Sequence, residues 1–168
     1  TSFYLGSDAQ LPARPNVIVD GTLAAPPKPG ATLNTAYKYT IKNANSGLYL
    51  GVEGNNAQAG ADVQQVENEA IWTVQSAGGG YYYVYSSLGD GKTYMLDLDY
   101  GKADNGTNIG IYTSTNSDAQ LFKFVPNGDG TYTITTKNTR DASCIGISGG
   151  SKETGATAIQ WECNDSDD

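Results

Sequence analysis

The sequence contains no histidine among its 168 residues. Histidine is the commonest general base, the usual partner of a catalytic serine or cysteine, and the commonest zinc ligand. Its absence excludes most hydrolase chemistry other than that of paired carboxylates. The 18 Asp and Glu residues show no pair whose spacing places two carboxylates for catalysis, so the sequence predicts neither an enzyme nor a bound cofactor or metal.

Basic residues are also scarce, since 10 Lys and Arg stand against 18 Asp and Glu and give a net charge of −8 and a pI near 4.3. The electrostatic field of a protein with this negative net charge repels phosphate backbones and anionic lipid surfaces. No apolar run approaches the ~20 residues that span a bilayer. The composition therefore predicts no nucleic-acid partner and no membrane partner.

Helix-forming residues are thinly represented, with a single methionine, whereas 12 tyrosines and 21 glycines are present. This balance favours short strands and turns over helices. The length allows one domain of ordinary size with room for a tail and a linker. We therefore expect an all-β domain.

The front of the chain differs in composition from the rest. Residues 22–35 hold three of the six prolines and show no strand-like alternation, which predicts an extended linker. Residues 1–21 before it are too few to bury a core and are interpreted as the C-terminal tail of an upstream domain. Residues 36–168 are then the main domain.

Three copies of one unit fill residues 36–168. Two landmarks recur with the same offsets of 46 and then 49 residues: Gly51, Asp97 and Gly146, and Gly60, Gly106 and Gly155. Each unit shows short alternating strands separated by turn chemistry such as Gly-Asp-Gly at 89–91. Three units of about four strands each define a β-trefoil, a closed barrel capped by hairpins.

The last strand of the third unit is apparently missing. Trp72 and Phe122 lie where the last strands of the first two units enter the shared core, but the chain ends before a third such aromatic. An unpaired barrel edge would remain. Either residues beyond Asp168 close the barrel, or the segment Phe3–Leu5 or Val17–Asp20 does so.

These units resemble the ricin B-type lectins, which include the family 13 carbohydrate-binding modules. The family's mark is a Gln-any-aromatic triplet that closes each repeat; residues 120–122 (Gln-Leu-Phe) keep it and residues 70–72 (Ala-Ile-Trp) keep the aromatic. The resemblance implies a disulfide between Cys144 and Cys163 within the third repeat. Such a bond would stabilise the fold by about 3 kcal/mol and fits a secreted protein.

The resemblance also implies a sugar site in the second repeat. In this family a carboxylate on the second strand accepts hydrogen bonds from adjacent sugar hydroxyls, and a later aromatic ring stacks on the sugar. Asp97 and Tyr112 occupy these positions, Gln120 would orient the carboxylate or touch the sugar, and Asn116 and Asp118 are further candidates. The repeat departs from the family at Gly110 and Ala119, where polar side chains are usual.

The other two repeats lack part of this set. The first has Gly51 for the acid and Val66 for the ring, which predicts a structural repeat. The third has Gly146 for the acid but keeps Trp161 for the ring, which makes it a secondary candidate for sugar stacking.

The expected function is that of a non-catalytic carbohydrate-binding module of a secreted bacterial enzyme. Residues 1–21 resemble the closing segment of the family 11 polysaccharide lyases, the rhamnogalacturonan lyases, which implies a catalytic domain in the same parent chain. The acidic balance favours neutral plant cell-wall chains such as galactan, arabinan, xylan or pectin side chains. The alternative is a sugar-silent trefoil that acts as a structural or protein-interaction domain.

Overall fold

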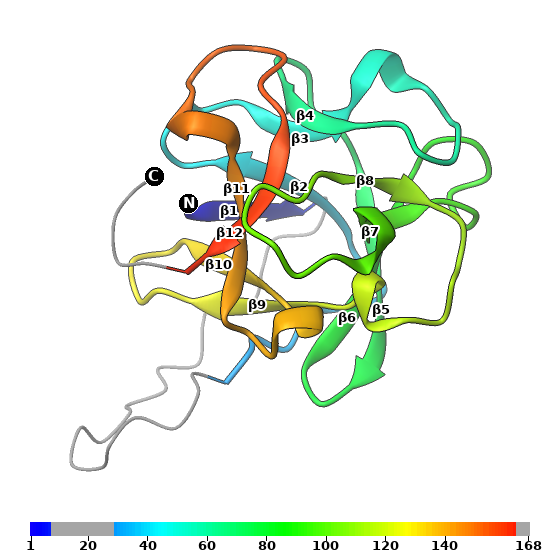
Figure 1. The fold of residues 1–168 in the computed structure, drawn as a ribbon, viewed down its shortest axis with the longest axis vertical. Helices are drawn as coiled ribbons and strands as arrows, with labels where there is room; N and C mark the ends of the chain where they lie inside the picture. Colours follow the sequence, from blue (N-terminus) through cyan, green and yellow to red (C-terminus); the bar gives the residue numbers. More distant parts are fainter. Residues whose placement is uncertain (8–28, 164–168) are drawn as a thin grey trace.

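The computed structural model describes residues 1–7 and 29–163 and consists of short strands joined by turns (Figure 1). Twelve strands form one continuous sheet. Their bounds are β1 (Phe3–Ser7), β2 (Lys38–Asn43), β3 (Tyr49–Val52), β4 (Val63–Val66), β5 (Trp72–Gly78), β6 (Tyr81–Ser86), β7 (Met95–Leu98), β8 (Ile109–Tyr112), β9 (Phe122–Pro126), β10 (Tyr132–Thr136), β11 (Ser143–Ile147) and β12 (Ala158–Glu162).

In residues 1–7 and 29–163, helical structure is limited to five single turns of 3-10 helix between the strands. They are η1 (Glu53–Asn55), η2 (Asp99–Gly101), η3 (Asp118–Gln120), η4 (Lys137–Thr139) and η5 (Ser148–Gly150). Within the described residues, no helix is long and apolar enough to cross a bilayer.

The strand pairing has threefold pseudo-symmetry and confirms the predicted β-trefoil. Repeat 1 contains β2–β5, repeat 2 contains β6–β9, and repeat 3 contains β10–β12. In repeat 1 the last strand, β5, pairs with β2 and with β6. In repeat 2 the last strand, β9, pairs in the same way with β6 and β10.

The strand that repeat 3 lacks is supplied by β1 at the N-terminal end of the chain. β1 pairs antiparallel with β10 and with β2, which is where the last strand of repeat 3 belongs (Figure 1). Its register repeats that of the other two, because Phe3 lies opposite Tyr132 as Trp72 lies opposite Tyr39. Of the two segments considered from the sequence, Phe3–Leu5 therefore closes the barrel, and Val17–Asp20 lies outside the described residues.

This arrangement changes the interpretation of the first residues. Residues 3–7 are part of the trefoil barrel, whereas the sequence had placed them in the tail of an upstream domain. The described end of the predicted linker also contacts the barrel, since Ala31 N donates to Phe124 O at 2.6 Å and Leu33 N donates to Tyr82 Oη at 2.9 Å. The part of the predicted linker before residue 29 lies outside the described residues, and the linker stays a prediction there.

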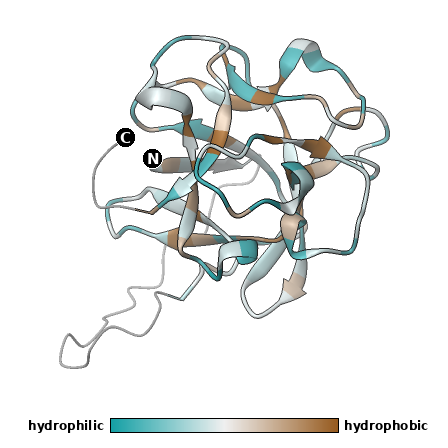
Figure 2. Cartoon of the chain, in the orientation of Figure 1, coloured by the Kyte–Doolittle hydropathy of each residue, from teal (hydrophilic) through white to brown (hydrophobic). Residues whose placement is uncertain are grey.

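The core contains one large aromatic side chain from the last strand of each repeat. Trp72, Phe122 and Phe3 are all fully buried, together with aliphatic side chains that alternate along the strands. The apolar stretches accordingly lie on the strands, and the connecting loops are polar (Figure 2). Burial of three equivalent rings explains why the barrel needs its twelfth strand.

The predicted disulfide is present. Cys144 on β11 is bonded to Cys163, 19 residues later, with a Cα–Cα distance of 5.2 Å. The bond joins β11 to the end of β12, and Cys163 N donates to Ala142 O at 2.9 Å beside it. The last described residues of the chain are thereby fixed to repeat 3.

Two buried glutamines connect one repeat to the next. Gln65 on β4 donates from Nε2 to the carbonyl oxygens of Ser151 and Glu153 in repeat 3, both at 3.0 Å. Its Oε1 accepts from Asn43 Nδ2 and Ser46 Oγ, both at 2.6 Å. Gln160 on β12 reaches the carbonyl oxygens of repeat 2 in the same way.

Replacing Gln65 by leucine is expected to lower the free energy of unfolding by about 2 kcal/mol, because its four hydrogen bonds, two of them to another repeat, would be lost. Urea unfolding followed by tyrosine and tryptophan fluorescence measures this loss. The control is Gln64→Leu, which changes the preceding, partly exposed residue of the same strand. Equal stability of Gln65→Leu and the wild type would show that these hydrogen bonds contribute nothing net.

Candidate functional site

Asp97 on β7 and Gln120 in η3 form the centre of the candidate site. The Asp97 side chain is held by Gln120, whose Nε2 donates to Asp97 Oδ2 at 3.0 Å and to Thr113 O at 2.8 Å. Gln120 Oε1 accepts from Thr115 N at 2.9 Å. Gln120 is fully buried and all its polar atoms are engaged, so in this conformation it orients the carboxylate and does not reach solvent.

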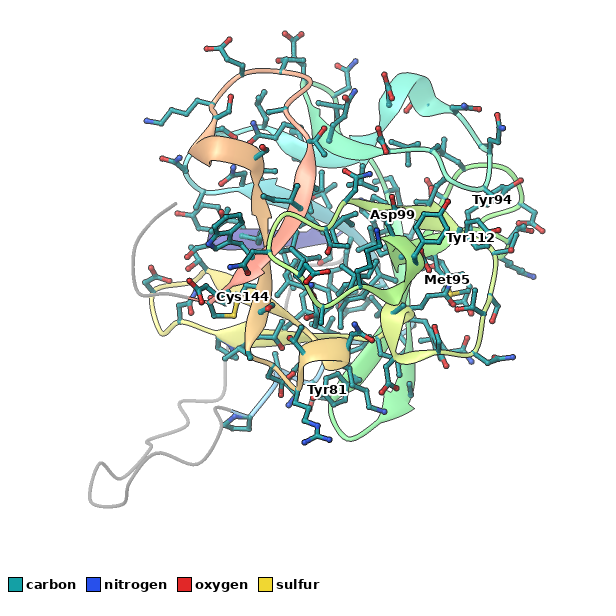
Figure 3. The ribbon with its side chains drawn as sticks, viewed as in Figure 1. Tyr81, Tyr94, Met95, Asp99, Tyr112 and Cys144 are labelled. Carbon is teal, nitrogen blue, oxygen red and sulfur yellow. A yellow bond between two sulfur atoms is a disulfide. The ribbon has the colours of Figure 1, made fainter. Side chains whose placement is uncertain are left out.

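Tyr112 lies on the same face of the β7–β8 hairpin as Asp97. Asp97 pairs with Gly110, and Met95 pairs with Tyr112. Because side chains alternate along a strand, Asp97 and Tyr112 are diagonal neighbours on one face, within about 8 Å of each other. Tyr112 is 42% exposed, and Figure 3 shows it beside Met95 at the end of the hairpin. The structure therefore brings together the acid and the ring that the sequence paired.

The pKa of Asp97 is raised to about 6. Burial of Asp97, which is 8% exposed, is the main cause of the raised pKa. The hydrogen bond from Gln120 opposes the shift, and the negative charge of Asp99 adds to it. The pKa of Asp99 is raised too, by burial and by the nearby Asp62, while Lys102 opposes the shift. Three carboxylates thus make the surroundings of the site acidic.

Among the residues that the structure describes, no group of three His, Cys, Asp or Glu side chains is placed to hold an ion. Asp62 is instead engaged by Asn108, whose Nδ2 donates to Asp62 Oδ1 at 2.6 Å. Asp90 lies in a turn between two glycines. Its Oδ1 accepts from the backbone N–H groups of Lys92 and Thr93 at 2.9 Å, as a turn-capping side chain does.

The presence of glycine at position 110 has a structural reason that the sequence did not reveal. A Cβ atom at this position would lie 2.8 Å from the carbonyl oxygen of Ala61 in repeat 1. That oxygen accepts a hydrogen bond from Ile111 N at 2.9 Å, so the two backbones are fixed at close approach. The site therefore lacks a polar side chain at Gly110 because a neighbouring repeat occupies the space.

The remaining candidates lie at the rim of the site. Asp118 is exposed and pairs with Lys137, with 3.3 Å between Oδ1 and Nζ. Asn116 has a left-handed backbone (φ 52°), and its Oδ1 accepts from Ser114 Oγ at 3.3 Å. Ala119 is buried against Gly101 in η2. Asn116 and Asp118 are thus accessible to a ligand, and Ala119 brings η3 against η2.

The corresponding positions of repeats 1 and 3 differ in space as well as in chemistry. In repeat 1 the side chains of Val66 and Ala70 close the volume beside Gly51. In repeat 3 a Cβ at Gly146 would lie 3.2 Å from Thr1 Oγ1. Trp161 is nevertheless 46% exposed, so repeat 3 offers a ring but has Gly146 at the position of the Asp97 carboxylate.

A barrel of three repeats with an oriented carboxylate and an exposed ring on one hairpin is the architecture of a β-trefoil lectin domain. The model of the ricin-type β-trefoil lectin domain-like family matches residues 30–112 and 72–161. The chain therefore belongs to this family. Among curated proteins, no relative matches the sequence.

Several solved structures are similar to the chain. ThreeFoil, a designed threefold-symmetric protein, has a TM-score of 0.71 and 25% identity over 77% of this chain and 92% of its own. The exo-β-1,3-galactanase 1,3Gal43A from Clostridium thermocellum has a TM-score of 0.69 and 27% identity over 75% of this chain and 27% of its own. The C-half of the earthworm R-type lectin in complex with GalNAc has a TM-score of 0.57 and 18% identity over 77% of this chain and 92% of its own.

Two features beside the site were missed from the sequence. The influence of Asp62 was not expected, because Asp62 comes from repeat 1 across a contact that is not local and its charge acts on Asp99. Tyr100 was also not singled out. Alignment of the three repeats could have found it, since the other two repeats have glycine at its position.

Proposed function

We propose that this chain is a non-catalytic carbohydrate-binding domain whose principal site is in repeat 2. The observation that carries the proposal is the Asp97 carboxylate, held by Gln120 on the same face as the exposed Tyr112. A pyranose presents an apolar C–H face to a ring and adjacent hydroxyl protons to a carboxylate, and this pair provides both partners. Trp161 is proposed as a weaker, secondary stacking position.

The proposed ligand is a neutral glycan. The carboxylates of Asp62, Asp97 and Asp99 and the net charge of −8 oppose uronates and sialylated sugars. Two similar structures point towards galactose chemistry: one is named as an exo-β-1,3-galactanase, and the other is a lectin in complex with GalNAc. We therefore place galactan first among the neutral plant cell-wall chains, ahead of arabinan, xylan and other pectin side chains.

The proposed role is to hold a secreted enzyme on its polysaccharide. A single shallow site binds weakly, because the small surface area buried by one sugar ring is offset by the loss of the sugar's translational and rotational freedom. Tethering to a catalytic domain raises the effective concentration of the chain and makes weak binding useful. The disulfide is consistent with an oxidising compartment. A rhamnogalacturonan lyase as the parent enzyme rests on the resemblance of residues 1–21, of which residues 3–7 form β1 of this barrel.

Calorimetric titration with galactan, arabinan, xylan and rhamnogalacturonan fragments tests the proposal. We expect heat with one neutral glycan and its loss in Asp97→Asn, which removes the charge but can still accept the hydrogen bond from Gln120. The matched control is Asp90→Asn, which makes the same change in an exposed turn of repeat 2 and should bind as the wild type does. If none of the glycans gives a heat of binding, the proposal is wrong, and a structural or protein-interaction trefoil is the remaining interpretation.

A further inference from the structure

Each repeat contains the same left-handed turn directly after its second strand. The middle residue of η1, η2 and η5 has φ values of 60°, 53° and 64°, with ψ near 18° in all three. The residues at these positions are Gly54, Tyr100 and Gly149. Glycine adopts this conformation without strain, whereas a residue with a Cβ atom is disfavoured there. Repeat 2 therefore carries a strained tyrosine where its two counterparts have the unstrained residue.

Packing of the Tyr100 ring does not account for the strain. Tyr100 is 93% exposed, whereas Tyr4, Tyr112 and Trp161, the other exposed large hydrophobic side chains of the described residues, are 42–46% exposed. The Lys102 ammonium lies 5.7 Å from the ring centroid, which is a solvated and weak contact. Strained residues that are not needed for the fold tend to occur at binding sites. An exposed ring in a disfavoured conformation thus points to a ligand.

The turn that carries Tyr100 borders the candidate sugar site. Tyr100 follows Asp99, whose charge acts on Asp97, and precedes Gly101. A Cβ atom at Gly101 would lie 3.7 Å from the Cβ of Ala119 in η3, next to Gln120. η2 and η3 are therefore adjacent walls of the same site.

Tyr100 and Tyr112 lie towards opposite ends of the β7–β8 hairpin. Tyr112 pairs with Met95, whereas Leu98, two residues before Tyr100, pairs with Ile109. Three residues of strand separate these pairs by roughly 10 Å. Asp97 lies between these pairs in the hairpin, so the two exposed tyrosines come from either side of the carboxylate, a backbone spacing that suits two neighbouring sugar units.

We propose that Tyr100 is a second aromatic contact of this site and binds the sugar unit next to the one held by Asp97 and Tyr112. The inference rests on the proposed function and deepens it, because it makes the ligand an oligosaccharide stretch of a neutral glycan rather than a single sugar. It also assigns a reason to the presence of tyrosine at a position built for glycine.

Titration of the wild type, Asp97→Asn and Tyr100→Gly with galactose and with β-1,3-galactotriose tests this inference. Tyr100→Gly restores the residue of repeats 1 and 3, so its melting temperature should equal or exceed that of the wild type. Its affinity for the trisaccharide should fall about tenfold, the loss of one stacked ring, while its affinity for galactose stays within about twofold. Tyr100→Phe should keep the affinity for the trisaccharide.

The control is Tyr4→Thr, which removes an exposed tyrosine from β1, outside repeat 2, and should leave both affinities unchanged. Equal trisaccharide affinity of Tyr100→Gly and the wild type, with binding still lost in Asp97→Asn, would overturn the role of Tyr100 and leave the proposed function intact. An equal loss for galactose and the trisaccharide would overturn the second sugar position. Absence of binding by the wild type would overturn both proposals.

Discussion

Deletion of residues 1–7 is expected to abolish the cooperative unfolding of this domain. β1 supplies the twelfth strand of the barrel, pairs with β2 over five residues and inserts Phe3 into the core. Without it, β2 and β10 would each have an unpaired edge, and the core would open on one side. The single substitution Phe3→Ala should lower the free energy of unfolding by about 4 kcal/mol, the typical loss for a buried phenylalanine.

Urea unfolding followed by near-ultraviolet circular dichroism measures both effects. Tyr4→Ala is the matched control for Phe3→Ala, because the next residue of the same strand points outwards and is 46% exposed. It should change stability by less than about 1 kcal/mol. A synthetic peptide of residues 1–7 added to the deletion variant should restore folding, which separates the loss of a strand from general damage. An unchanged melting temperature after the deletion would contradict the closure of the barrel by β1.

The threefold fold was predictable because its evidence is periodic. Two landmarks with the same offsets define three units, and the alternation of side chains along a strand places Asp97 and Tyr112 on one face. The sequence also shows Trp72 and Phe122 as the core aromatics of the first two units. It does not show that Phe3 completes the set, because the pairing of β1 with β2 and β10 is a non-local contact and two segments of the chain have suitable apolar residues.

The chemistry of the site was less predictable because it depends on neighbours from other repeats. Gly110 resembles a lost polar residue in the sequence, whereas the structure shows that the Ala61 backbone requires a glycine there. The raised pKa of Asp97 depends on burial and on Asp99, and Asp99 is in turn influenced by Asp62. These steric and electrostatic effects arise from contacts between repeats, so they cannot be inferred from the sequence of a single repeat.

Glycan affinity is expected to fall about 100-fold between pH 7 and pH 4. Asp97 has a pKa of about 6, so its carboxylate is ionised at pH 7 and protonated at pH 4. Only the ionised form accepts hydrogen bonds from two sugar hydroxyls, and each pH unit below the pKa therefore lowers the apparent affinity about tenfold. Calorimetric titration of the wild type with its glycan at pH 7, 6, 5 and 4 measures the decline. A constant affinity over this range would contradict the role of the Asp97 charge.

The stability of the domain should respond to the same group in the opposite direction. The pKa of Asp97 is raised on folding from its ordinary value of 3.8, so between about pH 4 and pH 6 the folded state keeps a proton that the unfolded state has lost. The contribution of Asp97 to stability therefore falls as the pH rises through this window and stays low above it. The Asp97→Asn variant has no carboxylate to ionise and therefore avoids this loss of stability. It should be more stable than the wild type by on the order of 2 kcal/mol at pH 7 and equally stable near pH 4.

Urea unfolding of both proteins across this range isolates Asp97, because the titration of the other carboxylates cancels in the difference. Asp90→Asn is again the matched control: its pKa is lowered by hydrogen bonds from the Lys92 backbone N–H and the Thr93 side chain, so its difference from the wild type should have the opposite sign. A difference for Asp97→Asn that does not change with pH would show that the buried carboxylate carries no penalty. A difference that grows towards pH 7, together with loss of glycan binding, would show that Asp97 is kept for its ligand at the expense of the fold.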